Sequence, residues 1–371
     1  MSKDGVLRIS RESLRDYLAS LYGEGVEICG VWVLGGKESK ASEDLKGFGY
    51  GFPYVIEFKV GGKVKRVVLE TMRSEGFGHD HFVDRAQILL WQYSAFNKLY
   101  KHVRSVDVGA FGKKDECLAS LGECSEFFIL TEFVEGKLYH FDLDCIRETG
   151  ELSAVDERRC LALSDYLAEI HKVKRDAPWL YVRRARELVG HGECIMGLLD
   201  SYPPKLRITP ESYLIGVEQA SIVWRWRLKH KAHRLSQVHG AFHPWNVLFR
   251  EGTDFTVLGR SRGEWGEPAD DVAAMTINYL FYSLQKYGEL TGVFERLFKL
   301  FWENYLDKTG DSEILEVVQP FYAWRGLIAA SPIWYPKLDK EVRAKLLSFV
   351  KNVLGSEKLD LKNVNSYLNS V

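Results

Sequence analysis

The stretch that most restricts the fold of this chain runs from residue 236 to residue 249 and reads Ser-Gln-Val-His-Gly-Ala-Phe-His-Pro-Trp-Asn-Val-Leu-Phe. It passes through a tight polar loop, which contains Gly240 and Pro244, into a short apolar strand. A second β-rich segment, residues 253–258, follows closely and ends at Gly259. The pattern predicts a loop that leads into a two-stranded hairpin.

Length and composition place the chain among soluble globular proteins. Its 371 residues suffice for one large two-lobed domain or for two ordinary ones. Hydrophobic residues make up 46% and charged residues 27%, and the net charge of −1 gives no global reason to expect attraction to nucleic acid or membranes. The sequence has no apolar run long enough to cross a bilayer and no apolar secretory signal at its start, so we expect a cytoplasmic protein.

The cysteine pattern favours free thiols, and the histidine-containing segment at residues 79–84 favours a helix cap over a metal centre. The six cysteines form no Cys-x-x-Cys pair, and in a reducing cytosol we expect mostly buried thiols. His79, His81 and Asp84 are potential metal ligands, but such a site needs further rigidly held groups. Asp80 or Asp84 more simply caps the helix that follows.

The first part of the chain predicts a small antiparallel sheet. A helix over residues 10–22 begins at Ser10, a capping residue, and has apolar residues at helical spacing. Residues 26–34 are β-rich, and a hairpin with a Gly61-Gly62 turn follows over residues 54–69. Residues 127–136 then form a buried strand that runs into a connector.

From residue 142 onward the pattern is mainly helical. The segment 223–234 interleaves tryptophan with positive charge, which could stack bases and hold the phosphates of RNA. On a helix, however, Trp224, Leu228 and Leu235 would share one buried face, and we favour this amphipathic helix. Other helices are expected over residues 160–171, 274–284 and 294–305.

The chain resembles the aminoglycoside phosphotransferase family, which is the small-molecule branch of the protein-kinase-like fold. The resemblance rests on residues 236–261, on 161–171 upstream and on 267–273 downstream. The resemblance extends from about residue 26 to the C-terminal helices and is most specific over residues 239–271. It implies an α+β, bilobal protein-kinase-like fold. A small antiparallel β-sheet N-lobe would occupy residues 1–135, and a large, mainly helical C-lobe residues 136–371, with the catalytic-loop region at 236–271.

The resemblance also implies that two catalytic carboxylates are missing. In this family the loop reads His-Gly-Asp, four residues, Asn, where the Asp accepts the proton of the substrate hydroxyl and the Asn helps to hold magnesium. Here His239, Gly240 and Asn246 are present, but Ala241 stands at the position of the base. A second, metal-binding Asp is expected thirteen residues after Asn246, where this chain has Gly259.

Neighbouring residues are the candidates for replacing the lost groups. His243 is the better stand-in base, because the residue equivalent to His239 braces the loop in this family. For the metal ion, the candidate ligands near in sequence are Glu264, Glu267 and Asp270. The resemblance assigns Asp271 to anchoring the loop, and we expect His171 to cap the C-terminus of its helix.

ATP or another nucleoside triphosphate, with magnesium, is the cofactor that the resemblance implies. A Gly-rich segment between the first two strands would cover the phosphates, although a flexible surface loop has the same composition. The backbone of the connector would hydrogen-bond the adenine. The residues expected to contact the nucleotide are Lys46, Gly47, Gly49, Gly51, Glu132 and Val134.

The third strand carries an unusual charge. Kinases place a phosphate-holding Lys there, paired with a Glu on the next helix, whereas this strand ends in Glu70. We expect a charge-reversed pair of Glu70 with Arg85 or Arg73. Lys46, Lys65 or Arg73 would then have to supply the positive charge for a nucleotide.

These residues support three functional hypotheses. The first is a small-molecule kinase scaffold, related to enzymes that transfer phosphate from ATP to a hydroxyl group, which is inactive or strongly impaired. Loss of a general base typically costs roughly 10²–10⁴ in rate. The second is an enzyme with displaced catalytic groups, and the third a pseudokinase-like regulatory protein that binds a nucleotide, a small molecule or RNA. The first hypothesis implies a nucleotide and a small hydroxylated molecule as partners.

Overall fold

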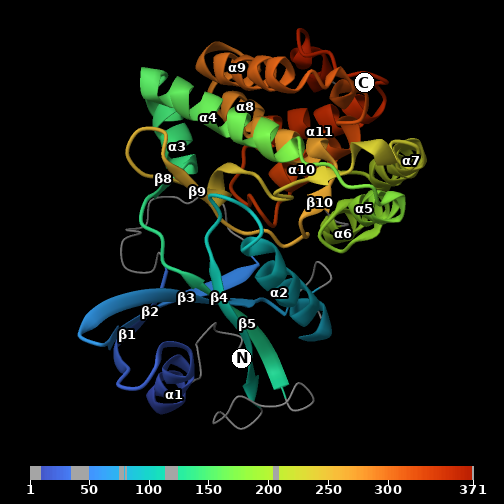
Figure 1. Cartoon of the computed structure of the whole chain (residues 1–371). Coiled ribbons are helices and arrows are strands. Elements are labelled where there is room, and N and C mark those ends of the chain that lie inside the picture. The colour runs from blue at the N-terminus through green and yellow to red at the C-terminus, as the bar shows by residue number, and fades with distance from the viewer. Residues whose placement is uncertain are drawn as a thin grey trace. The chain divides into compact units, whose positions relative to one another are not determined.

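The fold is α+β, as predicted (Figure 1). The computed structural model describes residues 10–34, 50–74, 79, 82–112, 124–203 and 209–369. These residues divide into two compact units, one up to Glu135 and the other from Gly136 onward. The first unit holds an antiparallel sheet, and the second is mainly helical.

The first unit contains a five-stranded antiparallel sheet in the order β1-β2-β3-β5-β4. Strands β2 and β3 are joined by Gly61 and Gly62, whose φ angles of 55° and 75° suit the two positive-φ positions of a tight hairpin turn. The predicted hairpin is therefore confirmed. The elements of this unit are α1 (Arg11–Tyr22), β1 (Glu27–Val33), β2 (Gly51–Val60), β3 (Lys63–Met72), α2 (Phe82–Phe96), β4 (Ser105–Gly112) and β5 (Cys124–Glu132).

Helix α1 supplies much of the core of the first unit. Its N-terminus is capped as predicted, because the Ser10 hydroxyl accepts a hydrogen bond from the Ser13 backbone N–H at 3.0 Å. Apolar residues one helical turn apart, such as Leu14 and Leu18, pack with buried side chains of the sheet, among them Phe58. The amphipathic pattern thus fixes the face of α1 that meets the sheet.

Helix α2 begins two residues before Asp84, at Phe82. Asp84 lies inside the first turn and is not the residue that precedes the helix, so the prediction that Asp84 caps it is wrong. Asp80 and His81 lie outside the described residues, and His79 is buried.

The second unit is built around α8 (Pro268–Tyr287), a helix that is buried along nearly all of its length. A helix that is hydrophobic on every side must be enclosed by other elements, and α8 packs against α9 and α10. Both appear beside α8 in Figure 1. The remaining helices are α3 (His140–Thr149), α4 (Ala154–His171), α5 (Pro178–Gly190), α6 (Ile195–Ser201), α7 (Glu211–Leu228), α9 (Gly292–Thr309), α10 (Gln319–Ala330) and α11 (Lys340–Leu354).

Two small sheets complete the second unit and frame the loop singled out by the sequence. Strand β7 (Ser236–Gln237) pairs with β10 (Trp265–Gly266), and β6 (Lys137–Leu138), β8 (Val247–Phe249) and β9 (Phe255–Val257) form the other sheet. The residues between β7 and β8 are thus fixed at both ends. The predicted loop and hairpin are confirmed.

Helix α7 is shorter at its C-terminal end than predicted. It ends at Leu228, and residues Ala232–Arg234 form a 3₁₀ turn instead of continuing the α-helix. Trp224, Leu228 and Leu235 are all buried, as the amphipathic reading required.

Two further features concern the described part of the chain. None of its helices combines the length and the apolar character that a bilayer span requires. Cys29, Cys145, Cys160 and Cys194 are free thiols, and burial raises the pKa of Cys160 and Cys194 to about 12.

Candidate active site

Asp271, in the first turn of α8, holds the loop between β7 and β8 in place. Its carboxylate accepts hydrogen bonds from the backbone N–H groups of His239 and Gly240, both at 2.7 Å, and lies 3.2 Å from His171 Nε2. Burial opposes ionisation of Asp271, but the hydrogen bonds from His171 and the backbone keep its pKa below the usual carboxyl value. The loop is therefore clamped by a buried negative charge.

His171 connects α4 to this clamp. Its Nδ1 lies 2.8 Å from the hydroxyl of Tyr305 and its Nε2 faces Asp271. Both ring nitrogens are thus engaged by side chains from α8 and α9. The prediction that His171 caps the C-terminus of its own helix is wrong, because its ring nitrogens bind Tyr305 and Asp271 instead. Both partners lie 100 or more residues away, so local sequence could not reveal them.

His239 is a neutral, fully buried brace. Its Nδ1 accepts a hydrogen bond from the Ala241 N–H at 3.2 Å, which requires that this nitrogen carry no proton. Burial lowers the pKa of His239 to about 4, so the ring is uncharged at neutral pH. Its position and protonation suit support of the loop.

The structure brings Ala241, Asn246 and Gly259 together. The Asn246 side-chain amide donates to the carbonyl of Ala241 at 2.9 Å, and the Leu258 N–H donates to the Asn246 carbonyl at 2.8 Å. A Cβ atom at Gly259 would lie 3.2 Å from Asn246 Nδ2. The backbone carbonyl of residue 241 and the Cα of residue 259 thus both lie next to the same amide group.

Gly259 has a left-handed backbone conformation with φ of 62°. Glycine adopts it without strain, and among other residues Asn and Asp enter it most readily. An Asp at 259 would therefore be strained, but less than most other residues, and Asn246 would have to shift slightly to admit its Cβ. The proposed substitute base, His243, is half-buried, and its backbone N–H donates to the Ala241 carbonyl at 3.0 Å.

Arginines hold the carbonyl side of the same loop. Arg260 donates to the carbonyl of Val238 through Nε and Nη2, at 3.0 and 2.7 Å. Arg262 Nε and Arg325 Nη2 both donate to the carbonyl of Gly240, at 3.1 and 3.3 Å. The loop conformation is therefore set by groups that bind its backbone.

The carboxylates proposed as substitute metal ligands are engaged elsewhere. Asp270 forms an ion pair with Arg325, and Glu267 pairs with Arg234 and accepts a hydrogen bond from the hydroxyl of Tyr181 at 2.6 Å. Ion-paired carboxylates with buried partners cannot turn to a metal ion without breaking those pairs. The idea that Glu267 or Asp270 replaces the lost metal ligand is therefore wrong. The third candidate, Glu264, is half-buried.

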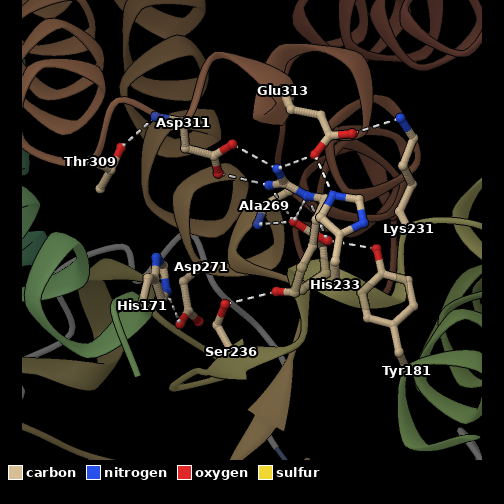
Figure 2. A network of polar contacts seen from close by, with 12 residues as sticks. His171, Tyr181, Lys231, His233, Ser236, Ala269, Asp271, Thr309, Asp311 and Glu313 are labelled. Carbon is tan, nitrogen blue, oxygen red and sulfur yellow. Dashed lines mark hydrogen bonds and ion pairs between the residues drawn. The ribbon is translucent and has the colours of Figure 1, made fainter. Parts of the chain in front are cut away.

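Arg234 is the centre of a buried polar network that sequence reasoning missed. Figure 2 shows this network, with Asp311, Glu313 and Lys231 among its labelled residues. Its guanidinium contacts Glu267 at 2.8 Å, Asp311 at 2.6 Å and Glu313 at 3.3 Å. The network ties the 3₁₀ turn before β7 to the start of α8, since Arg234 ends that turn and Glu267 immediately precedes the helix. Lys231 and the exposed His233 also bind Glu313, which keeps the pKa of that carboxyl at about 2 although burial opposes ionisation. Its acidic members lie up to 79 residues further along the chain, so no local pattern could reveal it.

In the first unit, several of the residues expected to bind nucleotide can be located. Glu132 is the last residue of β5, where its N–H donates to the carbonyl of Arg104 at 3.0 Å, and Val134 follows the strand. Gly51 is the first residue of β2. Lys46, Gly47 and Gly49 lie outside the described residues.

The expected pair of Glu70 with Arg85 or Arg73 is not formed. Arg85 instead binds Glu126 of β5 at 2.8 Å, and both side chains are buried. The Glu70 carboxyl lies against Gly51, where an added Cβ would come within 2.2 Å of Oε1. Burial raises its pKa to about 7, because no ion pair links Glu70 to another described residue.

Together, the antiparallel sheet, the mainly helical second unit and the loop clamped from the start of α8 define the protein-kinase-like class. No protein-family model matches the sequence, and no curated protein matches it significantly. Among solved structures, a candidate aminoglycoside phosphotransferase of Ralstonia eutropha JMP134 is similar over 97% of this chain and 98% of its own, with a TM-score of 0.54 and 12% identity. The amicoumacin kinase hAmiN, solved with AMP-PNP, Ca²⁺ and Ami, is similar over 98% of this chain and 100% of its own, with a TM-score of 0.54 and 15% identity.

At these identities the comparisons establish the fold. The chain has the protein-kinase-like fold, as the resemblance predicted.

Proposed function

We propose that this chain is an aminoglycoside-phosphotransferase-like small-molecule kinase scaffold in which transfer of phosphate from ATP to a hydroxyl group is lost or strongly impaired. The observation that carries the proposal is the meeting of Ala241, Asn246 and Gly259 around one amide group, without a carboxylate at either family position. The loop keeps a braced shape, because Asp271 and the arginines hold its backbone. What is missing is the chemistry of two side chains.

The first deficit concerns the proton of the acceptor hydroxyl. At position 241 a methyl group stands where a carboxylate would accept it, and His239 is neutral with Nδ1 occupied by a backbone N–H. A missing general base costs roughly 10²–10⁴ in rate. His243 remains the candidate substitute for the missing base, because its imidazole is half-buried and lies two residues after position 241 in the loop.

The second deficit concerns magnesium. Magnesium is held by oxygen ligands, usually carboxylates together with phosphates and water. Asn246 offers one amide, whose nitrogen is already directed at the Ala241 carbonyl. Across the described ranges, Asp, Glu, His and Cys residues form no cluster of three that could hold a metal ion. These residues do not fit the metal, and we derive no catalytic step through it.

Nucleotide binding is part of the proposal. ATP would be bound by the backbone at Glu132 and Val134 and by the glycine-rich segment with Lys46, Gly47, Gly49 and Gly51. The neighbour hAmiN was solved with AMP-PNP, which supports a nucleotide as the ligand of this fold. Glu70, with its raised pKa, would bear no full negative charge near neutral pH.

The decisive experiment restores both carboxylates. We expect the Ala241→Asp/Gly259→Asp variant to phosphorylate at least one member of a panel of hydroxylated small molecules, at least about 100-fold faster than the unchanged chain. The matched control is Ala241→Asn/Gly259→Asn, which has nearly the same shape and the same tolerance of positive φ but no charge. It should show no gain.

A folded double-Asp variant that transfers no phosphate to any acceptor would overturn the proposal. Calorimetry of the unchanged chain with ATP separates it from the other hypotheses. Binding that is indifferent to magnesium agrees with the loss of the metal ligand, whereas magnesium-dependent binding with slow turnover would favour displaced catalytic groups.

A further inference from the structure

A cavity lies beside the candidate catalytic loop, wholly within the second unit. It encloses about 530 Å³ of free space, part of it open to solvent. Gly240, the residue before Ala241, forms part of its wall. Most of the remaining wall is apolar or aromatic and comes from α5, β10 and α10: Tyr181, Ala185, Leu188, Trp265, Phe321 and Trp324.

Each carboxylate in the cavity wall is already neutralised. Glu187 binds Arg184 on its own helix at 2.6 Å, and Glu267 and Asp270 are held by Arg234 and Arg325. A cationic ligand would therefore find only carboxylates committed to buried or partly buried arginines. Taking one of them would leave an arginine uncompensated, which strongly disfavours the exchange.

The guanidinium groups in the wall are committed as well. Arg184 binds Glu187 and donates to the carbonyl of Trp265 at 2.9 Å. Arg262 binds Glu193 at 2.7 Å and lies over the ring of Trp324. The wall thus carries no uncompensated charge of either sign, which favours an uncharged ligand.

One polar group in the wall has no hydrogen-bond partner. The indole N–H of Trp265 is buried, and no described residue accepts a hydrogen bond from it. A buried donor left without an acceptor is destabilising, and such groups are rare in folded proteins. A ligand with an oxygen acceptor would satisfy it.

We propose that this cavity binds a small, uncharged aromatic molecule that carries a hydroxyl or similar oxygen, and that it discriminates against polycationic aminosugars. The aromatic walls would cover the ring of the ligand, and Trp265 Nε1 would donate to its oxygen. The idea that this molecule also accepts phosphate next to residue 240 rests on the proposed function. The idea that the cavity binds the molecule does not.

The test uses calorimetric titration of the full chain with 2-naphthol, an uncharged hydroxylated aromatic, and with naphthalene, which lacks the oxygen. We expect 2-naphthol to bind and kanamycin, which carries several ammonium groups, not to displace it. Ala185→Phe fills the cavity and should weaken binding at least about tenfold. The same substitution at Ala154, exposed at the start of α4, should leave binding unchanged.

Trp265→Phe provides a second test that does not depend on filling the cavity. It removes the buried donor and keeps an aromatic ring, so 2-naphthol should bind about threefold to tenfold more weakly while naphthalene binding stays the same. An absence of 2-naphthol binding, displacement by kanamycin, or indifference to both substitutions would overturn the proposal. Binding of 2-naphthol by a double-Asp variant that cannot phosphorylate any acceptor would refute the proposed function and leave the cavity assignment intact.

Discussion

The buried neutral state of His239 predicts a specific dependence of stability on pH. The folded chain lowers the pKa of this imidazole from about 6.5 to about 4, because the ring is fully buried. In the unfolded chain the same imidazole takes up a proton near pH 6.5. Acid therefore favours the unfolded state, and the stability that His239 contributes is present above pH 6.5 and is lost as the pH falls toward 4.

The size of the effect follows from those two values. Between pH 7 and pH 5 the difference in proton binding should lower the free energy of unfolding by about 2 kcal/mol, and by about 3 kcal/mol once the folded pKa is reached. The suitable substitution is His239→Asn, since the side-chain oxygen can accept the Ala241 N–H in place of Nδ1 and does not titrate. Its baseline stability will be lower, so the slope with pH is the quantity to compare.

Urea unfolding at pH 7, 6 and 5, followed by tryptophan fluorescence, measures that slope. Eight of the ten tryptophans lie after residue 136, so the signal reports mainly on the unit that contains His239. The unchanged chain should lose about 2 kcal/mol more than the variant across this range. Parallel curves would show that His239 is not held neutral by burial and would refute the reasoning.

Further predictions concern the buried charges. Asp271→Asn replaces an acceptor of two backbone N–H groups and should lower the free energy of unfolding at pH 7 by about 2–4 kcal/mol in urea titrations. Arg234→Gln leaves buried carboxylates uncompensated and should cost about 3–5 kcal/mol in the same assay. Arg296→Gln, which breaks an exposed pair, is the control and should leave the free energy of unfolding nearly unchanged. In the first unit, Arg85→Leu should lower the free energy of unfolding by about 3–5 kcal/mol, because it leaves Glu126 buried without its partner. Adding Glu126→Leu should restore most of that loss in a double-mutant cycle. A double variant as unstable as Arg85→Leu alone would argue against an ion-pair origin.

The parts of this structure that were predictable depend on neighbours in the sequence. The cap at Ser10 and the Gly61-Gly62 turn follow from local backbone chemistry, and both are confirmed. Helical and strand periodicity identified most elements, with errors at their ends, as where α7 stops at Leu228. The loop between β7 and β8 could be placed because its spacing to Gly259 restricts the hairpin.

What could not be predicted depends on which distant side chains meet. Arg234 has an ordinary place in a basic segment, yet it is buried because Glu267 and Asp311 reach it from other elements. The partner of Arg85 proved to be Glu126, which is 41 residues away, and not the nearer Glu70. Pairing of this kind is decided by packing, which a single sequence does not specify.

The loop is gripped through its main chain, by Asp271 on its N–H groups and by Arg260, Arg262 and Arg325 on its carbonyls. Neither Ala241 nor Gly259 contributes a side chain to that grip. Form and reactivity are consequently separable in this molecule. An acidic group can be removed or reinstated at 241 without touching the groups that hold the loop, whereas at 259 it also requires a small shift of Asn246.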